Sequence, residues 1–377
     1  MRNIFLLITI AAIVFTFVSC SQDNSGTKDE TINLTVRITN TSISGRAVEA
    51  PGTAVAATLT DGWIFLVSST TGNVVRSVEL NVGEALQSGA GTGQIVTGVP
   101  SNARIYIVGN LPGAYPGNYD AIKNLATLSA IQNYVLNTEG QDGRGHTGVT
   151  LANESGNAIP INHVSGATTA SVSVNLSPLV GRLELVSAVA VDYTTGAAAV
   201  NPNRTYTITG FTVTGVFADN YYEEFTLAGV GDELFSQGTE FKQFDGIGDE
   251  DSWGAVAGTA IPGNDNVWAY NLPAMTGNMP RLILRLENIS ASWSDSGGSG
   301  TVNFAGQIRF VTVVSYRHNN VSGAAITAFE RGNIYRINGV QFNINNLSFT
   351  PNPSEDVTVT TDVDVLDWNV EDMYHNL

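Results

Sequence analysis

The sequence predicts an all-β protein of two β-sandwich domains in tandem. Three observations favour this fold class. Apolar and polar residues alternate with period two in many short segments, glycine is frequent with 39 residues, and charged residues make up only 14% of the chain. Such alternation buries one face of a strand, whereas surface helices would need more Glu, Lys and Arg. With 377 residues, the chain is long enough for two domains.

Residues 1–20 are predicted to form a lipoprotein signal peptide. Arg2 precedes a run of about 15 apolar-biased residues, which suits a signal-peptide core better than a membrane span. The run ends in Ser19-Cys20, and Cys20 is the only cysteine of the chain, so no intrachain disulfide can form. A small residue before a cysteine resembles a bacterial lipobox, in which the thiol is acylated. The alternative is an ordinary secretory signal with a free cysteine.

The first strand is predicted at 32–39, after a polar tether that begins at residue 21. Its apolar residues all fall on one face of a period-two pattern: Ile32, Leu34, Val36 and Ile38. A loop of small residues follows at 40–56 and contains the bond between Arg46 and Ala47. We expect residues 47–168 to form the first sandwich domain.

Within that first domain, short strands are expected at 62–67, 74–80 and 104–110. Apolar residues at three-residue spacing predict one helix over 119–135, and 137–166 has no clear period and is expected to be loop.

We expect residues 169–377 to form the second domain. Residues 170–191 alternate on both sides of Ser177-Pro178. Five later strands are predicted at 206–216, 221–227, 281–289, 304–316 and 334–344. A Gly-rich acidic stretch at 228–265 is expected to be a long surface excursion. A tail from about residue 354 carries one more alternating segment, and its valines share one face: Val357, Val359, Val363 and Val365.

Charge and motifs argue against catalysis and against nucleic-acid binding. The net charge is −17 with a pI near 4.5, so no large basic patch is expected. The four histidines lack metal-ligand spacing, and no GxSxG or phosphate-binding loop occurs. Carboxylates cluster between Asp245 and Asp251, where a calcium site or a glycosidase pair is a weaker alternative to a solvated loop. We therefore expect no enzyme, no cofactor and no metal.

Aromatic residues offer one candidate ligand site. Trp253 and Trp268 fall in predicted loops, where an exposed indole could stack on a sugar ring. The alternative is that such residues pack in the core.

The two ends of the body suggest strand exchange between copies. Removing strand 32–39 by a cut at Arg46 would expose an apolar groove with unpaired backbone groups. The alternating tail of another copy could fill that groove by β-strand addition. The alternative is that both strands stay in their own sheets, and the pattern alone does not choose between them.

The layout resembles the FimA-type fimbrillins, the subunits of type V pili. The matching pieces run in order along nearly the whole chain: VSC at 18–20, LTVRITNTSISGRAVE at 34–49, WIFLV at 63–67, RIYIVGNLPG at 104–113, VNLSPLVGRLEL at 174–185, TITGFTVTGVFADNYY at 207–222, NIYRINGVQFNI at 333–344 and DW at 367–368. Within the 174–185 piece, Pro178 stands where the family usually has a basic residue.

The resemblance implies two transthyretin-like sandwich domains and a precursor that is acylated and then cleaved. It implies an outer-membrane lipoprotein precursor acylated (palmitate) at Cys20. An arginine-specific protease then cuts between Arg46 and Ala47, and strand 32–39 leaves. The subunit joins other copies, or related pilus subunits, by donor-strand exchange in an extracellular fimbrium that contributes to adhesion.

Three alternatives remain open from the sequence. A tip or accessory adhesin of the same pilus would share the fold. A glycan-binding surface lipoprotein would share the lipobox, the sandwiches and exposed tryptophans. A secreted glycosidase is the weakest of the three.

Overall fold

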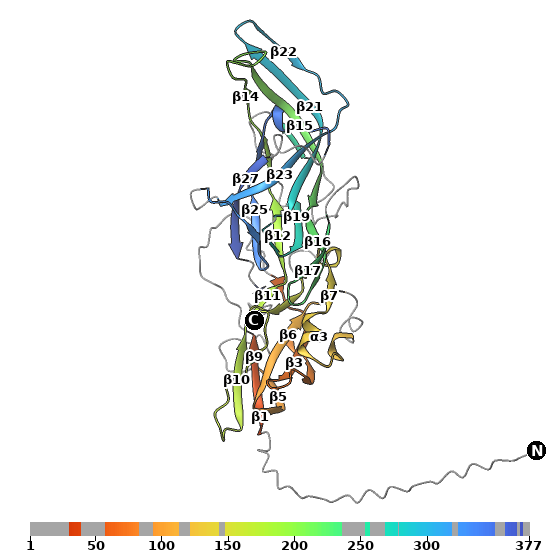
Figure 1. Cartoon of the computed structure of the whole chain (residues 1–377), viewed down its shortest axis with the longest axis vertical. Helices are drawn as coiled ribbons and strands as arrows, with labels where there is room; N and C mark the ends of the chain where they lie inside the picture. The colour runs from red at the N-terminus through yellow and green to blue at the C-terminus, as the bar shows by residue number, and fades with distance from the viewer. Residues whose placement is uncertain are drawn as a thin grey trace, which may run out of the picture.

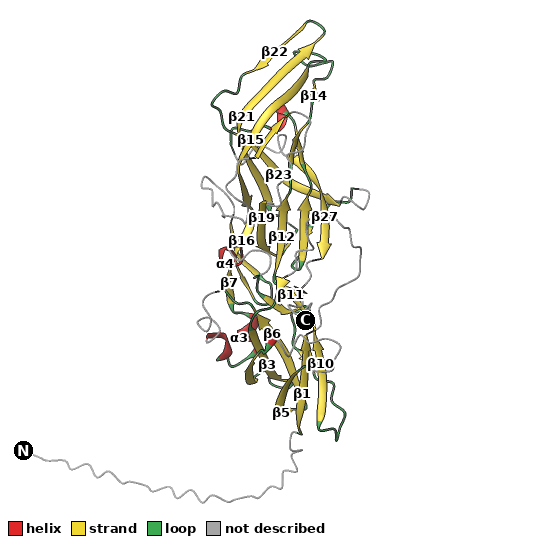
Figure 2. Ribbon diagram, turned by 180° about the vertical axis from the view of Figure 1, so that it is seen from behind, coloured by secondary structure: helices red, strands yellow, loops and turns green. Residues whose placement is uncertain are grey.

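A computed structural model shows an elongated, predominantly β molecule (Figure 1). It describes residues 30–38, 57–82, 93–112, 121–142, 148–235, 253–256, 268–277, 279–318, 323–350, 359–367 and 370–371. Strands β1, β5 and β10 lie at one end of the long axis, and β14, β21 and β22 lie at the other (Figures 1 and 2). The all-β class that the sequence predicts is therefore confirmed.

The first hydrophobic core lies between two sheets. A three-stranded sheet has the order β10-β1-β5, and a six-stranded sheet has the order β11-β8-β6-β3-β4, with β9 paired to β6. Both sheets contribute buried aliphatic and aromatic side chains to one cluster. The strands of this half are β1 (Thr31–Ile38), β2 (Ala57–Thr58), β3 (Gly62–Ser68), β4 (Val74–Glu79), β5 (Gln94–Pro100), β6 (Ala103–Gly109), β7 (Val135–Asn137), β8 (Leu151–Asn153), β9 (Ile159–Pro160), β10 (Thr169–Val174) and β11 (Leu176–Pro178).

The second core is built on a ten-stranded sheet. Its main path runs β14-β15-β21-β23-β27-β25-β12-β19, with β18 paired to β15 and β22 paired to β21. The remaining strands are β12 (Val180–Leu185), β13 (Ala188–Ala190), β14 (Tyr193–Thr194), β15 (Thr205–Asp219), β16 (Tyr221–Thr226), β17 (Gly231–Phe235), β18 (Trp253–Val256), β19 (Trp268–Pro273), β20 (Met275–Thr276), β21 (Arg281–Asp295), β22 (Gly298–Val302), β23 (Arg309–His318), β24 (Ala328–Phe329), β25 (Asn333–Ile337), β26 (Val340–Phe342), β27 (Val359–Asp367) and β28 (Val370–Glu371).

Strands on both sides of residue 168 contribute to the first core. β10 and β11 pack in the first core, which extends to Val180, and the second core begins with Leu183. Residues Phe225 and Leu227, far along the chain, also pack in the first core. The β16–β17 hairpin therefore joins the two halves, and it pairs with β7 of the first half.

The helices are few and short. Residues 121–123 are helical, and α3 (Leu128–Gln132) starts after Thr127, whose hydroxyl accepts a hydrogen bond from the Ala130 amide. The predicted single helix over 119–135 is thus wrong, because the Thr127 cap and its bridge to Asn73 interrupt it. The others are α4 (Thr138–Asp142) and the 3-10 turn η1 (Ile344–Asn346). Among the described residues, no helix has the length and apolarity of a membrane span.

Candidate functional site

Strand β1 occupies the centre of its sheet. It runs parallel to β10, with Leu34 opposite Ala170, and antiparallel to β5, with Leu34 opposite Val96. Residues 34–36 pair on both sides at once. A strand in this position leaves a gap between β5 and β10 if it is removed, so we call this position the β5–β10 slot.

The buried face of β1 is the one that the sequence predicts. The exposed fractions of Ile32, Leu34, Val36 and Ile38 lie between 0 and 3%, while Thr31 and Asn33 are exposed. Burying each such side chain contributes about 1.5–3 kcal/mol, so the four together contribute about 6–12 kcal/mol. Because whole domains are stable by only about 5–15 kcal/mol, an empty slot would need to be refilled.

Two residues of β5 and its approach shape the edge of the slot. At Gly93 any Cβ would lie 2.4 Å from the Val36 carbonyl oxygen, so only glycine allows the chain to come this close to β1. Gln94 then anchors β5, since its side chain donates to the Glu79 carbonyl and accepts from the Asn81 amide, both at 2.8 Å. These two side-chain contacts of Gln94 do not involve β1.

The tail strand β27 is also a central strand, in the second core. It runs parallel to β23 and antiparallel to β25, and we call its position the β23–β25 slot. Val363 is 1% exposed, and Thr361, on the same face, is 4% exposed. The β27 tail therefore lies in a sheet of its own molecule. This is the second of the two alternatives that the sequence left open, in which the terminal strands stay in their own sheets.

Each residue of β27 pairs with one neighbouring strand, whereas some residues of β1 pair with two. Residues 359–363 pair with β23 only, and residues 364–367 pair with β25 only. Side-chain contacts supplement them: the Ser315 and Thr360 hydroxyls lie 2.5 Å apart, and the Asn338 amide donates to Asp364 at 2.6 Å. The Thr361 hydroxyl reaches the Gly339 carbonyl at 3.5 Å, the limit of a hydrogen bond.

Two cavities flank the β23–β27 pair. One of about 290 Å³ lies where β25 and β26 turn away from β27, and Gly339, Gln341, Thr360 and Asp362 are among its lining. The other, of about 260 Å³, lies on the far side of β23.

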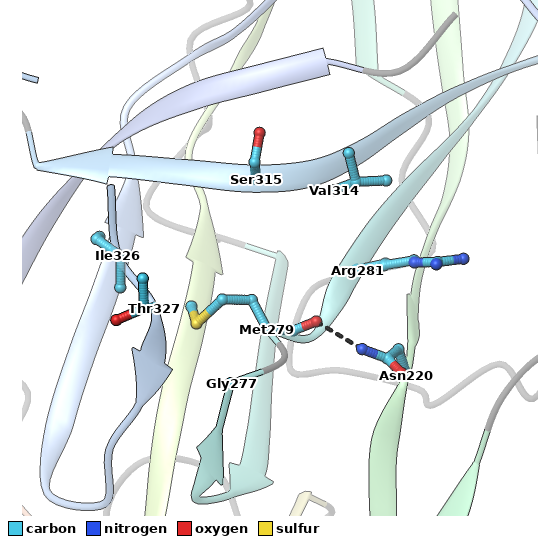
Figure 3. Close-up of a pocket in the computed structure, with 8 residues that line it drawn as sticks. All are labelled: Asn220, Gly277, Met279, Arg281, Val314, Ser315, Ile326 and Thr327. Carbon is cyan, nitrogen blue, oxygen red and sulfur yellow. Dashed lines mark hydrogen bonds between the residues drawn. The ribbon is translucent and has the colours of Figure 1, made fainter. Parts of the chain in front are cut away.

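Figure 3 shows the second cavity. Met279 reaches toward Ile326 and Thr327, Arg281 points away from them, and the Asn220 amide donates to the Met279 carbonyl at 2.8 Å. The Arg281 guanidinium lies 3.8 Å from the buried Asp219 carboxylate. The Asp219 carboxylate therefore offsets part of the positive charge of Arg281 beside the cavity.

A buried charge cluster lies beside the β23–β25 slot, and the sequence did not reveal it. Glu184 on β12 contacts Arg182 at 2.7 Å and Arg336 on β25 at 2.8 Å. Arg182 also donates to Asn271, whose amide donates to the Gln141 carbonyl of α4, both at 3.1 Å. Burial alone would raise the pKa of Glu184, yet the two guanidinium groups hold this pKa below its usual value.

The predicted ligand-stacking site contains Trp253 and Trp268, and the prediction is wrong for Trp268. Trp268 lies in β19 rather than in a loop, and its exposed fraction is 4%, because it packs in the second core. An indole so covered cannot stack on a sugar. The backbone of Trp253 lies in β18, also a strand, and nothing is described of its side chain.

Several other predicted residues lie outside the described part of the chain. They are Cys20, Arg46, Ala47, Val357 and the acidic cluster Asp245–Asp251. Val359 and Val365 belong to β27 by backbone. Within the described residues, no group of three or more His, Cys, Asp or Glu side chains is arranged to hold a metal.

Solved structures from several bacteria have a similar fold, and three of them are compared with this chain by coverage and identity. A candidate cell adhesion protein from Parabacteroides distasonis is 13% identical with a TM-score of 0.53, over 90% of this chain and 99% of that one. One from Bacteroides eggerthii is 15% identical with a TM-score of 0.51, over 91% and 97%. A FimA fimbrilin from Porphyromonas gingivalis is 12% identical with a TM-score of 0.50, over 90% and 98%.

These matches extend over nearly the full length of each protein, so the resemblance to the FimA-type fimbrillins is confirmed at the level of the fold. No protein-family model and no curated protein matches the sequence.

Proposed function

We propose that this chain is a non-catalytic structural subunit of a cell-surface fimbrium, with two transthyretin-like sandwiches. The precursor is exported to the outer membrane as a lipoprotein acylated at Cys20. An arginine-specific protease cuts between Arg46 and Ala47, which releases β1 with its lipid anchor. The β27 tail of another copy, or of a related subunit, then enters the β5–β10 slot.

The observation that carries this proposal is the place of β1. A strand at the chain's beginning fills the middle of a sheet with four apolar side chains, and one cut in the 39–56 connection would detach it. Loss of an edge strand would expose the backbone of one neighbouring strand. Loss of β1 would expose an apolar groove and the backbone edges of both β5 and β10. The shared fold with fimbrial and adhesion proteins agrees with this use.

The tail supports the proposal through its ladders. Each residue of β27 pairs on one side in the β23–β25 slot, whereas residues 34–36 of β1 pair on both sides in the β5–β10 slot. A β27 tail that moved from the β23–β25 slot to the β5–β10 slot would gain backbone hydrogen bonds, each contributing about 0.5–1.5 kcal/mol.

Mass spectrometry of protein shed from the cell surface tests the proposal. The mature chain is expected to begin at Ala47 and to run as a ladder of oligomers on unheated gels. An Arg46→Ala chain is expected to stay full length after the lipidation step and to form no ladder. Normal ladders from the Arg46→Ala chain would contradict the proposal.

A tip or accessory adhesin of the same fimbrium is the second candidate. Its distinguishing feature would be a tail that never donates. The docked β27 is compatible with such a role, and a disulfide that locks β27 to β23 separates the two candidates. The burial of Trp268 removes one of the two tryptophans on which the glycan-binding alternative depends.

A further inference from the structure

One asparagine of the chain is followed directly by glycine, and the pair forms the connection between β25 and β26. Among the 377 residues, Asn338–Gly339 is the only such pair. A glycine has no Cβ to hinder its own backbone nitrogen, so this nitrogen can reach the side-chain carbonyl carbon of the asparagine before it. The product is a succinimide ring, which water then opens. Asparagine before glycine is therefore the arrangement in which this self-modification is least hindered.

The fold leaves both reacting groups accessible. Asn338 is exposed, and Gly339 is half-buried. The Gly339 amide donates no hydrogen bond to another described residue, so folding does not occupy the attacking nitrogen. Both residues line the open cavity of about 290 Å³ beside Thr360 and Asp362, so water can reach the ring that the reaction forms.

The same asparagine holds the tail strand. Its side-chain amide donates to Asp364 of β27 at 2.6 Å, and the Gly339 carbonyl lies 3.5 Å from the Thr361 hydroxyl. On the other side, the Asn338 carbonyl accepts a hydrogen bond from the Ser187 hydroxyl. The contact with Asp364 engages the nitrogen that leaves in the reaction, and not the carbonyl carbon that is attacked.

We propose that Asn338 is a self-modification site, which converts to aspartate or isoaspartate and thereby loosens β27. The Gly339 nitrogen loses its proton to solvent and bonds to the side-chain carbonyl carbon of Asn338. The bond from that carbon to the side-chain nitrogen breaks, and the nitrogen leaves as ammonia. Water then adds to either carbonyl carbon of the ring and opens it. One water molecule is consumed for each ammonia released, and nothing is oxidised or reduced.

Either product weakens the hold on β27. Aspartate at position 338 has a carboxylate where the amide now donates to Asp364, so repulsion between like charges replaces a hydrogen bond. Isoaspartate also inserts one carbon into the main chain, which shifts the Gly339 carbonyl relative to the Thr361 hydroxyl. Chains that have stood longer since synthesis therefore hold β27 less firmly.

Peptide mapping by mass spectrometry tests the modification. The purified full-length chain, with Cys20→Ser, is incubated at neutral pH, and aspartate and isoaspartate are measured at every asparagine. Position 338 is expected to convert several-fold faster than any other asparagine. Conversion at 338 that is no faster than elsewhere would overturn the inference.

The matched variant is Gly339→Ala. Its Cβ would lie 3.0 Å from the Ser187 hydroxyl oxygen and 3.6 Å from the nearest Val189 carbon, so the methyl group fits after a small shift of the hydroxyl. The methyl group hinders the attacking nitrogen, and conversion at 338 is expected to fall about tenfold. An unchanged rate would show that the Gly339 nitrogen is not the nucleophile.

Thiol labelling measures the effect on the tail. Val363→Cys, in the same Cys20→Ser chain, should react only when β27 opens, because Val363 is 1% exposed. Asn338→Asp reproduces the aspartate product and is expected to raise the labelling rate several-fold. Asn201→Asp is the control for added charge, since Asn201 is exposed on the connection between β14 and β15, and it should leave the rate unchanged. Equal rates in the two variants would overturn the assigned effect on β27.

Val311→Cys on β23 separates opening of β27 from general unfolding, because Val311 is also buried. Its labelling rate should be the same with and without Asn338→Asp. A rise equal to that at Val363→Cys would contradict a local effect on β27. Neither measurement uses a cut at Arg46 or a ladder of oligomers, so failure of this inference leaves the proposed function standing, and the reverse holds as well.

Discussion

At the scale of single residues, the four aliphatic side chains of β1 carry the account. Each has almost no exposed surface, while the alternate side chains Thr31 and Asn33 face solvent. The buried and the exposed face of β1 can therefore be compared by one substitution on each face.

Leu34→Ala is expected to lower the free energy of unfolding of the precursor by about 2–5 kcal/mol, because it removes buried methyl groups and leaves a cavity. Asn33→Ala, on the exposed face, is expected to change it by less than about 0.5 kcal/mol. Urea denaturation measures both. After cleavage the two variants should give assembled material of equal stability, since β1 has left. A Leu34→Ala effect that persisted in the assembled material would show that β1 stays.

Glu184 is the second residue whose role can be measured. Glu184→Gln leaves the buried Arg182 and the partly buried Arg336 without their carboxylate, so we expect a loss of about 3–5 kcal/mol at pH 7. Because its pKa in the folded chain is lowered, the wild-type contribution is present above the unfolded value of about 4.3 and is lost as the pH falls through the folded pKa.

Urea midpoints between pH 2 and pH 7 check this prediction. Wild type should lose stability toward the acid end, and the Glu184→Gln variant should lose less. Glu287→Gln is the control, because Glu287 and its partner Arg285 are each about one-third exposed (34% and 30%), and such pairs contribute at most about 1 kcal/mol. Equal pH profiles for wild type and Glu184→Gln would contradict the assigned role.

At the scale of elements, β27 must leave its slot for the proposed function to operate. A disulfide between Ser315→Cys and Thr360→Cys should lock β27 to β23, because the two hydroxyls lie 2.5 Å apart. Cleaved protein with this lock is expected to stay monomeric and to form ladders once reduced. Gel filtration and unheated gels, with and without reductant, measure the change.

The control lock joins Ser292→Cys on β21 to Thr301→Cys on β22, which are register partners far from the tail. That variant should form ladders in both redox states. If the locked variant formed ladders as well as the control, donation of the β27 tail would be wrong. Cleaved protein that formed no ladder even after reduction would instead favour the tip or accessory role.

The sequence predicts individual strands better than their positions in a sheet. Period-two alternation placed the buried face of β1 correctly, because one face of that strand meets solvent. The same alternation in the tail fits an edge strand, a central strand or a donated strand equally well. Only the pairing of residues far apart in the chain, such as His318 with Val363, places β27 at the centre.

The candidate site was also only partly predictable, again because contacts between distant segments decide which side chains are buried. Trp268 follows a polar Gly-rich stretch, and this local context indicated a loop. Its burial comes from the pairing of β19 with β12, a contact between distant segments. The Arg182–Glu184–Arg336 cluster was hidden likewise, since alternation alone does not show that every residue of β12 is buried.

At the scale of the whole molecule, cleavage changes shape rather than charge. Residues 1–46 contain four basic and three acidic residues, so the net charge moves only from −17 to −18. The switch is therefore steric. Salt screens the repulsion between acidic subunits, but it does not empty the β5–β10 slot.

Uncleaved precursor is accordingly expected to form no ladder at any concentration between about 50 mM and about 1 M NaCl. Across this range the distance over which charges on two subunits repel each other shortens several-fold. Cleaved protein should form ladders throughout that range, faster at high salt. Ladders from uncleaved precursor at high salt would show that charge, and not β1, blocks assembly.

The most direct test asks which strand lies beside β10 after assembly. Ser171 is exposed on β10 and pairs with Thr35 of β1. Cleaved chains carrying Ser171→Cys are mixed with cleaved chains carrying a single cysteine at Thr358, Thr360 or Asp362 of the tail. The account predicts an interchain disulfide with at least one of the three, and none before cleavage. Ladders that form without any such link would contradict the replacement of β1 by the tail of another copy.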